Sequence, residues 1–172
     1  MTRSGLIGGC AVMLLSTTAQ AQNAAKAFEC NMPYRETMMA MGGLAVVSQT
    51  PVKGFPGLHG DGELISFATT GAQVFGIQPD KLSVEVLQPH RWQAKPQYKV
   101  TFAATFARTT STDEAIQRSV EWHILCGARS FCQNTEASRP AGGGRIEYRR
   151  EAELTLSCIF EFTEAEFEAL GQ

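Results

Sequence analysis

Leu154-Thr-Leu-Ser-Cys-Ile-Phe-Glu-Phe162 is the longest alternating run in the chain, with an apolar residue at every second position. Because successive side chains of a β-strand point to opposite faces, this pattern predicts one long strand whose apolar face packs on a core. Tyr98 to Phe106 alternates in the same way and is the clearest candidate for a central strand. These two stretches make β-structure the basis of the predicted fold.

Shorter runs with β character extend this predicted sheet and are separated by turn-forming pairs such as Thr70-Gly71 and Pro79-Asp80. We expect these further strands over residues 44–47, 63–68, 73–77 and 81–87. Only short helices are indicated around them. The sequence therefore predicts a mainly β domain, with α+β possible, built on a mostly antiparallel sheet or a sandwich.

Short helices are predicted from the signals at their ends. A short N-terminal helix has Asn31 as its expected cap and ends at Gly42-Gly43. A second helix is expected to begin with a capping box at Ser111, and a short C-terminal helix begins with another at Thr163.

The remaining stretches predict irregular structure. Residues 50–62 and 134–144 are rich in glycine, proline and polar residues, which favours loops. Residues 22–25 show no apolar periodicity and predict a flexible lead. No repeat or composition change suggests a boundary within the chain, so residues 22–172 are expected to form a single domain.

The first residues have the pattern of a cleavable signal peptide. Arg3 precedes an apolar run from Leu6 to Leu15, and Ala19-Gln20-Ala21 provides an A-x-A cleavage site. We therefore expect residues 1–21 to be removed and the rest to be periplasmic or secreted. In an alternative interpretation, Cys10 lies in a faint lipobox and carries a lipid anchor. The sequence contains no second long apolar run, so we expect no transmembrane segment after cleavage.

The charge of the chain is mildly acidic. It has 15 basic and 17 acidic residues, a formal net charge of −2. Removal of residues 1–21 takes away only Arg3, which leaves 14 basic against 17 acidic residues and a net charge of −3. Nucleic-acid binding requires a basic surface that releases counterions from phosphates, so we do not expect a nucleic-acid partner.

Cleavage after Ala21 removes Cys10 and leaves four cysteines, which we expect to form disulfides in an oxidising compartment. Four cysteines allow three pairings, and we favour Cys30 with Cys158 and Cys126 with Cys132. The alternative is a zinc site in which His123 joins Cys126, Cys132 and Cys158. The spacing between Cys126 and Cys132 exceeds that of typical structural zinc sites, so we expect neither a metal nor another cofactor.

A small basic and aromatic stretch is the first candidate binding surface. Arg91 and Trp92 are followed by Tyr98, with Lys95 and Lys99 between and beside them. Aromatic and arginine side chains are enriched at interfaces, so this stretch could meet a protein or an envelope polymer. The alternative is that Trp92 only covers a sheet edge.

A glycine-rich loop is the second candidate. His59 and Asp61 alternate with glycines there and could bind a cation or serve in hydrolysis, although a plain surface loop has the same composition. The chain has no G-x-S-x-G elbow and no S-x-x-K box. An exported metal-dependent or hydrolytic enzyme that uses this loop is therefore the alternative to a binding domain.

A third hypothesis is a copper-binding module. Met38, Met39 and Met41 lie close together, and thioethers are soft ligands that select Cu(I). On a helix, however, Tyr34, Met38 and Met41 share one face, which suits packing on a core. The leading interpretation is an exported, non-enzymatic binding domain whose surface includes the Arg91 to Lys99 stretch and the His59 loop.

Overall fold

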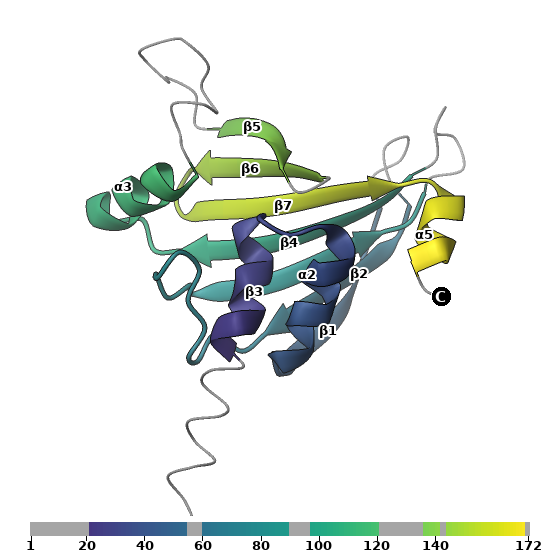
Figure 1. Ribbon diagram of the computed structural model, residues 1–172, viewed down its shortest axis with the longest axis horizontal. Coiled ribbons are helices and arrows are strands. Elements are labelled where there is room, and N and C mark those ends of the chain that lie inside the picture. Colours follow the sequence, from purple (N-terminus) through teal and green to yellow (C-terminus); the bar gives the residue numbers. More distant parts are fainter. Residues whose placement is uncertain (1–20, 55–59, 90–96, 121–135, 142–143, 171–172) are drawn as a thin grey trace, which may run out of the picture.

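The computed structural model describes residues 21–54, 60–89, 97–120, 136–141 and 144–170. They form a single domain in which one antiparallel sheet carries short helices on one face and at both ends (Figure 1). Of the two predicted architectures, the single sheet is the one observed. In the part of the chain that the structure describes, no helix has the length and apolarity needed to cross a membrane.

In the described part of the chain, seven strands build the sheet, in the order β1-β2-β3-β4-β7-β6-β5. All neighbouring pairs are antiparallel. The strands are β1 (Val46–Val52), β2 (Gly62–Phe67), β3 (Lys81–Leu87), β4 (Tyr98–Phe106), β5 (Glu136–Ala141), β6 (Gly144–Arg150) and β7 (Leu154–Phe162). The strands predicted over residues 81–87, 98–106 and 154–162 are confirmed with their boundaries.

The two longest strands lie side by side at the centre of the sheet. Phe102 on β4 is paired with Cys158 on β7, and Ala104 is paired with Leu156. All four side chains are buried on the same face. The core therefore sits on the apolar face that the alternation predicts, because each buried residue of one strand meets a buried residue of the other.

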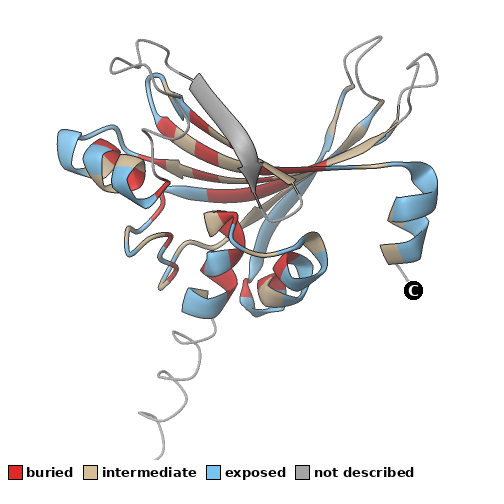
Figure 2. Ribbon diagram, turned by 45° about the horizontal axis from the view of Figure 1, so that its top comes forward, coloured by how far each residue is buried: buried red, intermediate tan, exposed pale blue. Residues whose placement is uncertain are grey.

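The N-terminal segment covers this apolar face. Residues 21–25 are helical and continue into η1 (Lys26–Glu29), and α2 (Tyr34–Ala40) and η2 (Met41–Gly43) follow. Figure 2 shows these elements across one side of the sheet. Phe28 of η1 is fully buried and meets the ring of Phe102 edge to face. At opposite ends of the sheet lie α3 (Thr110–Ser119) and α5 (Glu164–Leu170) (Figure 1).

A disulfide attaches the N-terminal cover to the sheet. Cys30, which follows η1, is bonded to Cys158 on β7 with a Cα–Cα distance of 5.2 Å. This predicted pairing is confirmed. Cys126 and Cys132 lie outside the described residues, so the second pairing stays a prediction, and the same holds for His123.

The predicted flexible lead at residues 22–25 is wrong. Ala24 and Ala25 are fully buried in the core, whereas Gln22 and Asn23 are exposed. In a short helix these small apolar side chains point to the core and their polar neighbours point to solvent. The stretch is too short for this arrangement to be visible as apolar periodicity in the sequence.

The strand predicted over residues 73–77 is also wrong, because the chain turns there. Val74 and Ile77 exchange backbone hydrogen bonds of 2.9 and 3.0 Å. Phe75 and Gly76 between them have φ values of 53° and 75°, the left-handed conformation of a tight two-residue turn.

Both sheet edges contain residues that were predicted to be loops. β1 begins two residues later than predicted and runs on through Pro51, and β5 contains Pro140. Proline removes a backbone donor but is tolerated on an edge strand, where that donor can face solvent. The predicted loops over residues 50–62 and 134–144 are therefore wrong where these strands lie.

The helix caps agree only in part with the prediction. Pro33 rather than Asn31 precedes α2 and makes no side-chain cap. At α3 the cap is Thr109 and not Ser111, since its hydroxyl accepts from the backbone N–H of Thr112 at 3.1 Å. The capping box at Thr163 is confirmed, because its backbone N–H donates to the Glu166 carboxylate at 2.8 Å.

Candidate binding groove

Among the described residues, an apolar hollow lies between the two helices α2 and α5. It has a volume of about 390 Å³, within the usual range for ligand sites. We call it the α2–α5 groove, and its lining is Tyr34, Arg35, Met38, Met39, Phe167 and Leu170. Five of these six side chains present mainly apolar surface, so the groove can bury an apolar group.

The packing of α2 explains why methionines line the groove. Thr37 and Met41 face the core and are 1% and 8% exposed. The Thr37 hydroxyl donates to the Pro33 carbonyl at 3.0 Å, which satisfies it inside the helix. On the side toward the groove, Met38 and Met39 remain 45% and 75% exposed. The predicted helix face of Tyr34, Met38 and Met41 is thus covered by the core only in part.

An aromatic cluster forms the base of the groove. The ring of Tyr34 lies edge to face against Phe162 and Phe160, with centroid distances of 4.6 and 5.5 Å. Phe167 lies 6.3 Å from Phe162. Both strand phenylalanines belong to the end of β7, so the central strand of the sheet supports both helices that border the groove.

Tyr98 holds α5 in place. Its ring stacks on Phe167 with a centroid distance of 4.1 Å and an interplanar angle of 6°. Tyr98 is a predicted binding residue, and the structure places it behind the groove lining as a support for Phe167. The capping box between Thr163 and Glu166 fixes the first turn of α5.

Carboxylates outnumber basic groups on the two helices. Glu164, Glu166 and Glu168 lie on α5, which has no basic residue, and α2 carries Glu36 beside Arg35. All five side chains are exposed. The backbone N–H and the hydroxyl of Thr163 lower the pKa of Glu166, so this carboxylate stays ionised at neutral pH.

The other described member of the predicted site, Asp61, has local partners. It is exposed, accepts from the backbone N–H of Gly54 at 3.0 Å and pairs with Lys53 at 3.1 Å. The Gly54 hydrogen bond and the Lys53 charge lower its pKa. These contacts tie together the two sides of the connection between β1 and β2.

The register brings the flanks of both predicted binding loops to one end of the sheet. Gln88, which follows β3, donates to the Asp61 carbonyl and accepts from Gly60. Tyr98 begins β4 at that same end, opposite Phe162 of β7. His59, Arg91 and Trp92 lie outside the described residues. Asp61 and Tyr98 thus share the end of the sheet that carries the α2–α5 groove, with β3 between their strands.

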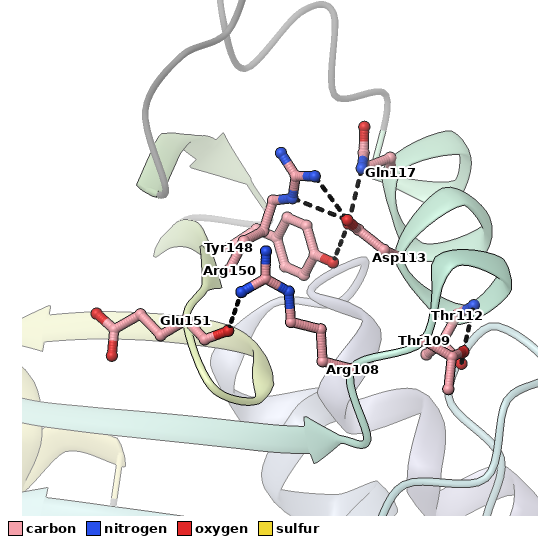
Figure 3. Close-up of polar contacts among 8 residues, drawn as sticks. All are labelled: Arg108, Thr109, Thr112, Asp113, Gln117, Tyr148, Arg150 and Glu151. Carbon is pink, nitrogen blue, oxygen red and sulfur yellow. Dashed lines mark hydrogen bonds and ion pairs between the residues drawn. The ribbon is translucent and has the colours of Figure 1, made fainter.

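A buried polar cluster lies at the opposite end of the sheet and was not predicted from the sequence (Figure 3). Asp113 on α3 accepts from the Tyr148 hydroxyl at 2.8 Å and from the Gln117 amide at 2.7 Å. Arg150 donates to its other oxygen from two nitrogens, at 3.0 and 2.6 Å. Nearby, Arg108 donates to the Glu151 carbonyl.

This polar cluster is structural. Both carboxylate oxygens of Asp113 are occupied by protein donors, and Tyr148 is fully buried. The cluster therefore attaches α3 to β6 and leaves neither carboxylate oxygen without a partner. Asp113 and Arg150 are 37 positions apart, so no local spacing in the sequence could reveal the pair.

These features define a single antiparallel-sheet domain, stapled by a disulfide, with an apolar groove at one end of the sheet. Comparison of the chain with known protein families, curated proteins and solved structures finds no match. Within the described residues, no group of three or more histidine, cysteine or acidic side chains is placed to hold a metal ion.

Proposed function

We propose that this protein is an exported, non-enzymatic binding domain of the bacterial envelope, periplasmic or secreted, and that the α2–α5 groove is its binding surface. The observation that carries the proposal is the exposure of Met38 and Met39 beside an aromatic base. Methionine is flexible and polarisable and is used at surfaces that adapt to apolar partners. The partner is a protein or an envelope polymer that inserts an apolar group.

The lining favours binding over catalysis. Among the described lining residues, Tyr34 and Arg35 are the only titratable groups, and burial raises the pKa of Tyr34, which keeps its hydroxyl neutral. General acid–base catalysis uses groups that exchange protons near the working pH. The lining instead offers apolar area and one fixed positive charge.

The alternatives gain no support from the contacts of the described residues. The Asp61 carboxylate is already held by Gly54 and Lys53. Met41 belongs to the core, while Met39 is exposed, so the three methionines of the copper hypothesis do not share one surface.

The test is the binding of a neutral apolar dye, Nile red, to the intact exported protein. We expect its fluorescence to rise with the wild type and to be lost in the double variant Met38→Gln/Met39→Gln. The control is Val47→Gln, which also replaces an exposed apolar residue, 68% exposed, that does not line the groove. Equal dye binding by the double variant and the wild type would contradict the proposal.

A further inference from the structure

We infer that the α2–α5 groove binds a basic, amphipathic segment of a protein partner, a conclusion that rests on the proposed function. The groove combines an apolar lining with an acidic border, and a basic amphipathic segment is complementary to both. Its lining is apolar, and the helices that border it carry one arginine against four glutamates. The partner should therefore present apolar side chains flanked by lysine or arginine.

The helical spacing places two carboxylates of α5 beside the groove. Phe167 and Leu170 are three positions apart and both line it. Glu164 lies three positions before Phe167, and Glu166 four positions before Leu170, so each adjoins a lining residue on the helix surface. Glu168 falls on the far side of α5. Two exposed negative charges thus border the apolar lining on its α5 side.

The α2 side adds a single positive charge, Arg35, which the described residues do not pair with a carboxylate. An acidic partner would gain this one contact but would meet the carboxylates of α5. On the two described helices, a basic partner gains several attractive pairs and is repelled only by Arg35. Exposed ion pairs are weak individually, so we expect selectivity to come from their number and to decrease with added salt.

The apolar lining and the acidic border of the groove suit a helix better than a lipid surface. Amphipathic helices bind hydrophobic grooves through side chains spaced three and four residues apart, and methionine linings adapt to such anchors. A bilayer with anionic lipids would be repelled by the same carboxylates that attract a basic peptide. The occupant is therefore a peptide segment.

The test compares two synthetic amphipathic peptides of about 14 residues, or four helical turns. Both carry leucine on one face, and the other face carries lysine in one peptide and glutamate in the other. We expect the lysine peptide to bind the wild-type protein about tenfold more tightly, with a Kd that weakens as salt increases. The readout is fluorescence anisotropy of labelled peptide, with vesicles containing anionic lipid as a third probe.

A charge variant tests the role of α5. Glu164→Gln/Glu166→Gln keeps the capping box, since glutamine also serves there, and removes two charges. We expect it to bind the lysine peptide about fivefold more weakly while Nile red binding is unchanged. The control Asp80→Asn/Glu114→Gln removes two exposed acidic charges that lie outside the groove lining, and it should bind as the wild type does.

The outcomes separate the two proposals. Nile red binding without a preference for the lysine peptide overturns this inference and leaves the groove as a binding surface. Stronger binding to the vesicles than to either peptide overturns it in favour of a membrane. If the dye and both peptides bind the Met38→Gln/Met39→Gln variant as well as the wild type, the proposed function itself fails.

Discussion

Asp113 is a buried charge whose cost is offset by the groups around it. The residue is 8% exposed, and it accepts four hydrogen bonds from Tyr148, Gln117 and Arg150. Burial raises the pKa of Asp113, but the hydrogen bonds and the Arg150 charge outweigh burial and hold it below its usual value. A carboxyl whose pKa is lower in the folded state stabilises the protein above its unfolded pKa, about 3.9. That stabilisation is lost as the pH falls through the folded pKa.

The variant Asp113→Asn should therefore be destabilised in a pH-dependent way. At pH 7 we expect it to lose about 3 kcal/mol of unfolding free energy, because it removes the charge that pairs with the half-buried Arg150. The difference from the wild type should narrow toward pH 3, because below about pH 3.9 the carboxyl of the unfolded wild-type chain takes up a proton that the folded carboxyl resists. Urea unfolding at both pH values measures it. Asp80→Asn, at an exposed position, is the control, and an equal difference at both pH values would contradict the prediction.

At the scale of elements, the central strands could be predicted from the sequence and the edge strands could not. In β3, β4 and β7 the face that packs on the core carries an apolar residue at every second position, so the sequence alternates there. β1 is exposed along nearly its whole length and contains proline, so its residues have the composition of a loop. Alternating apolar residues mark a strand in the sequence because one of its faces is buried. An exposed edge strand lacks this alternation and is identified only by the strand with which it pairs.

The candidate groove shows the same limit. The sequence predicted both helices that border it and selected Met38, Met39 and Tyr98. It could not show that α2 and α5 meet, since they come from opposite ends of the chain and are brought together by aromatic contacts with Phe162. The surface that these residues form therefore depends on long-range packing, which no local pattern in the sequence records.

The close packing at the start of β2 leads to a prediction at the scale of elements. A Cβ atom on Gly62 would lie 2.0 Å from the Val86 carbonyl oxygen and 2.9 Å from the Cα of Leu87. Gly62→Ala must therefore push β2 away from β3, and we expect a loss of about 2 kcal/mol in unfolding free energy. Gly42→Ala is the matched control, because its new methyl group would meet no atom within 4 Å. Thermal unfolding followed by circular dichroism compares them, and equal midpoints would contradict this account.

For the whole molecule, the Cys30–Cys158 bond joins positions 128 residues apart and fixes the N-terminal cover on the sheet. In the loop-entropy model such a bond contributes about 4 to 5 kcal/mol by restricting the unfolded chain. We expect Cys30→Ser/Cys158→Ser to lose stability of this order in urea unfolding and to bind less Nile red, because α2 begins at Tyr34, soon after Cys30. If the double variant unfolds at the same urea concentration as the wild type, the bond does not have this role.

Export is a prediction about the whole molecule, and the burial of residues near the N-terminus limits where the signal peptide can be cleaved. Because Ala24 and Ala25 are fully buried, processing beyond residue 23 would remove core side chains, whereas cleavage after Ala21 retains them. We therefore expect the exported protein to begin at Gln22. Its denatured, non-reduced mass should equal that of residues 22–172 less the hydrogens lost in two disulfides, the observed Cys30–Cys158 bond and the predicted Cys126–Cys132 bond. A mass that shows the hydrogens of only one disulfide missing would refute the Cys126–Cys132 pairing. A lipid added to Cys10 would show that the chain is processed there and not after Ala21. An uncleaved chain would remove the basis for placing the protein in the envelope.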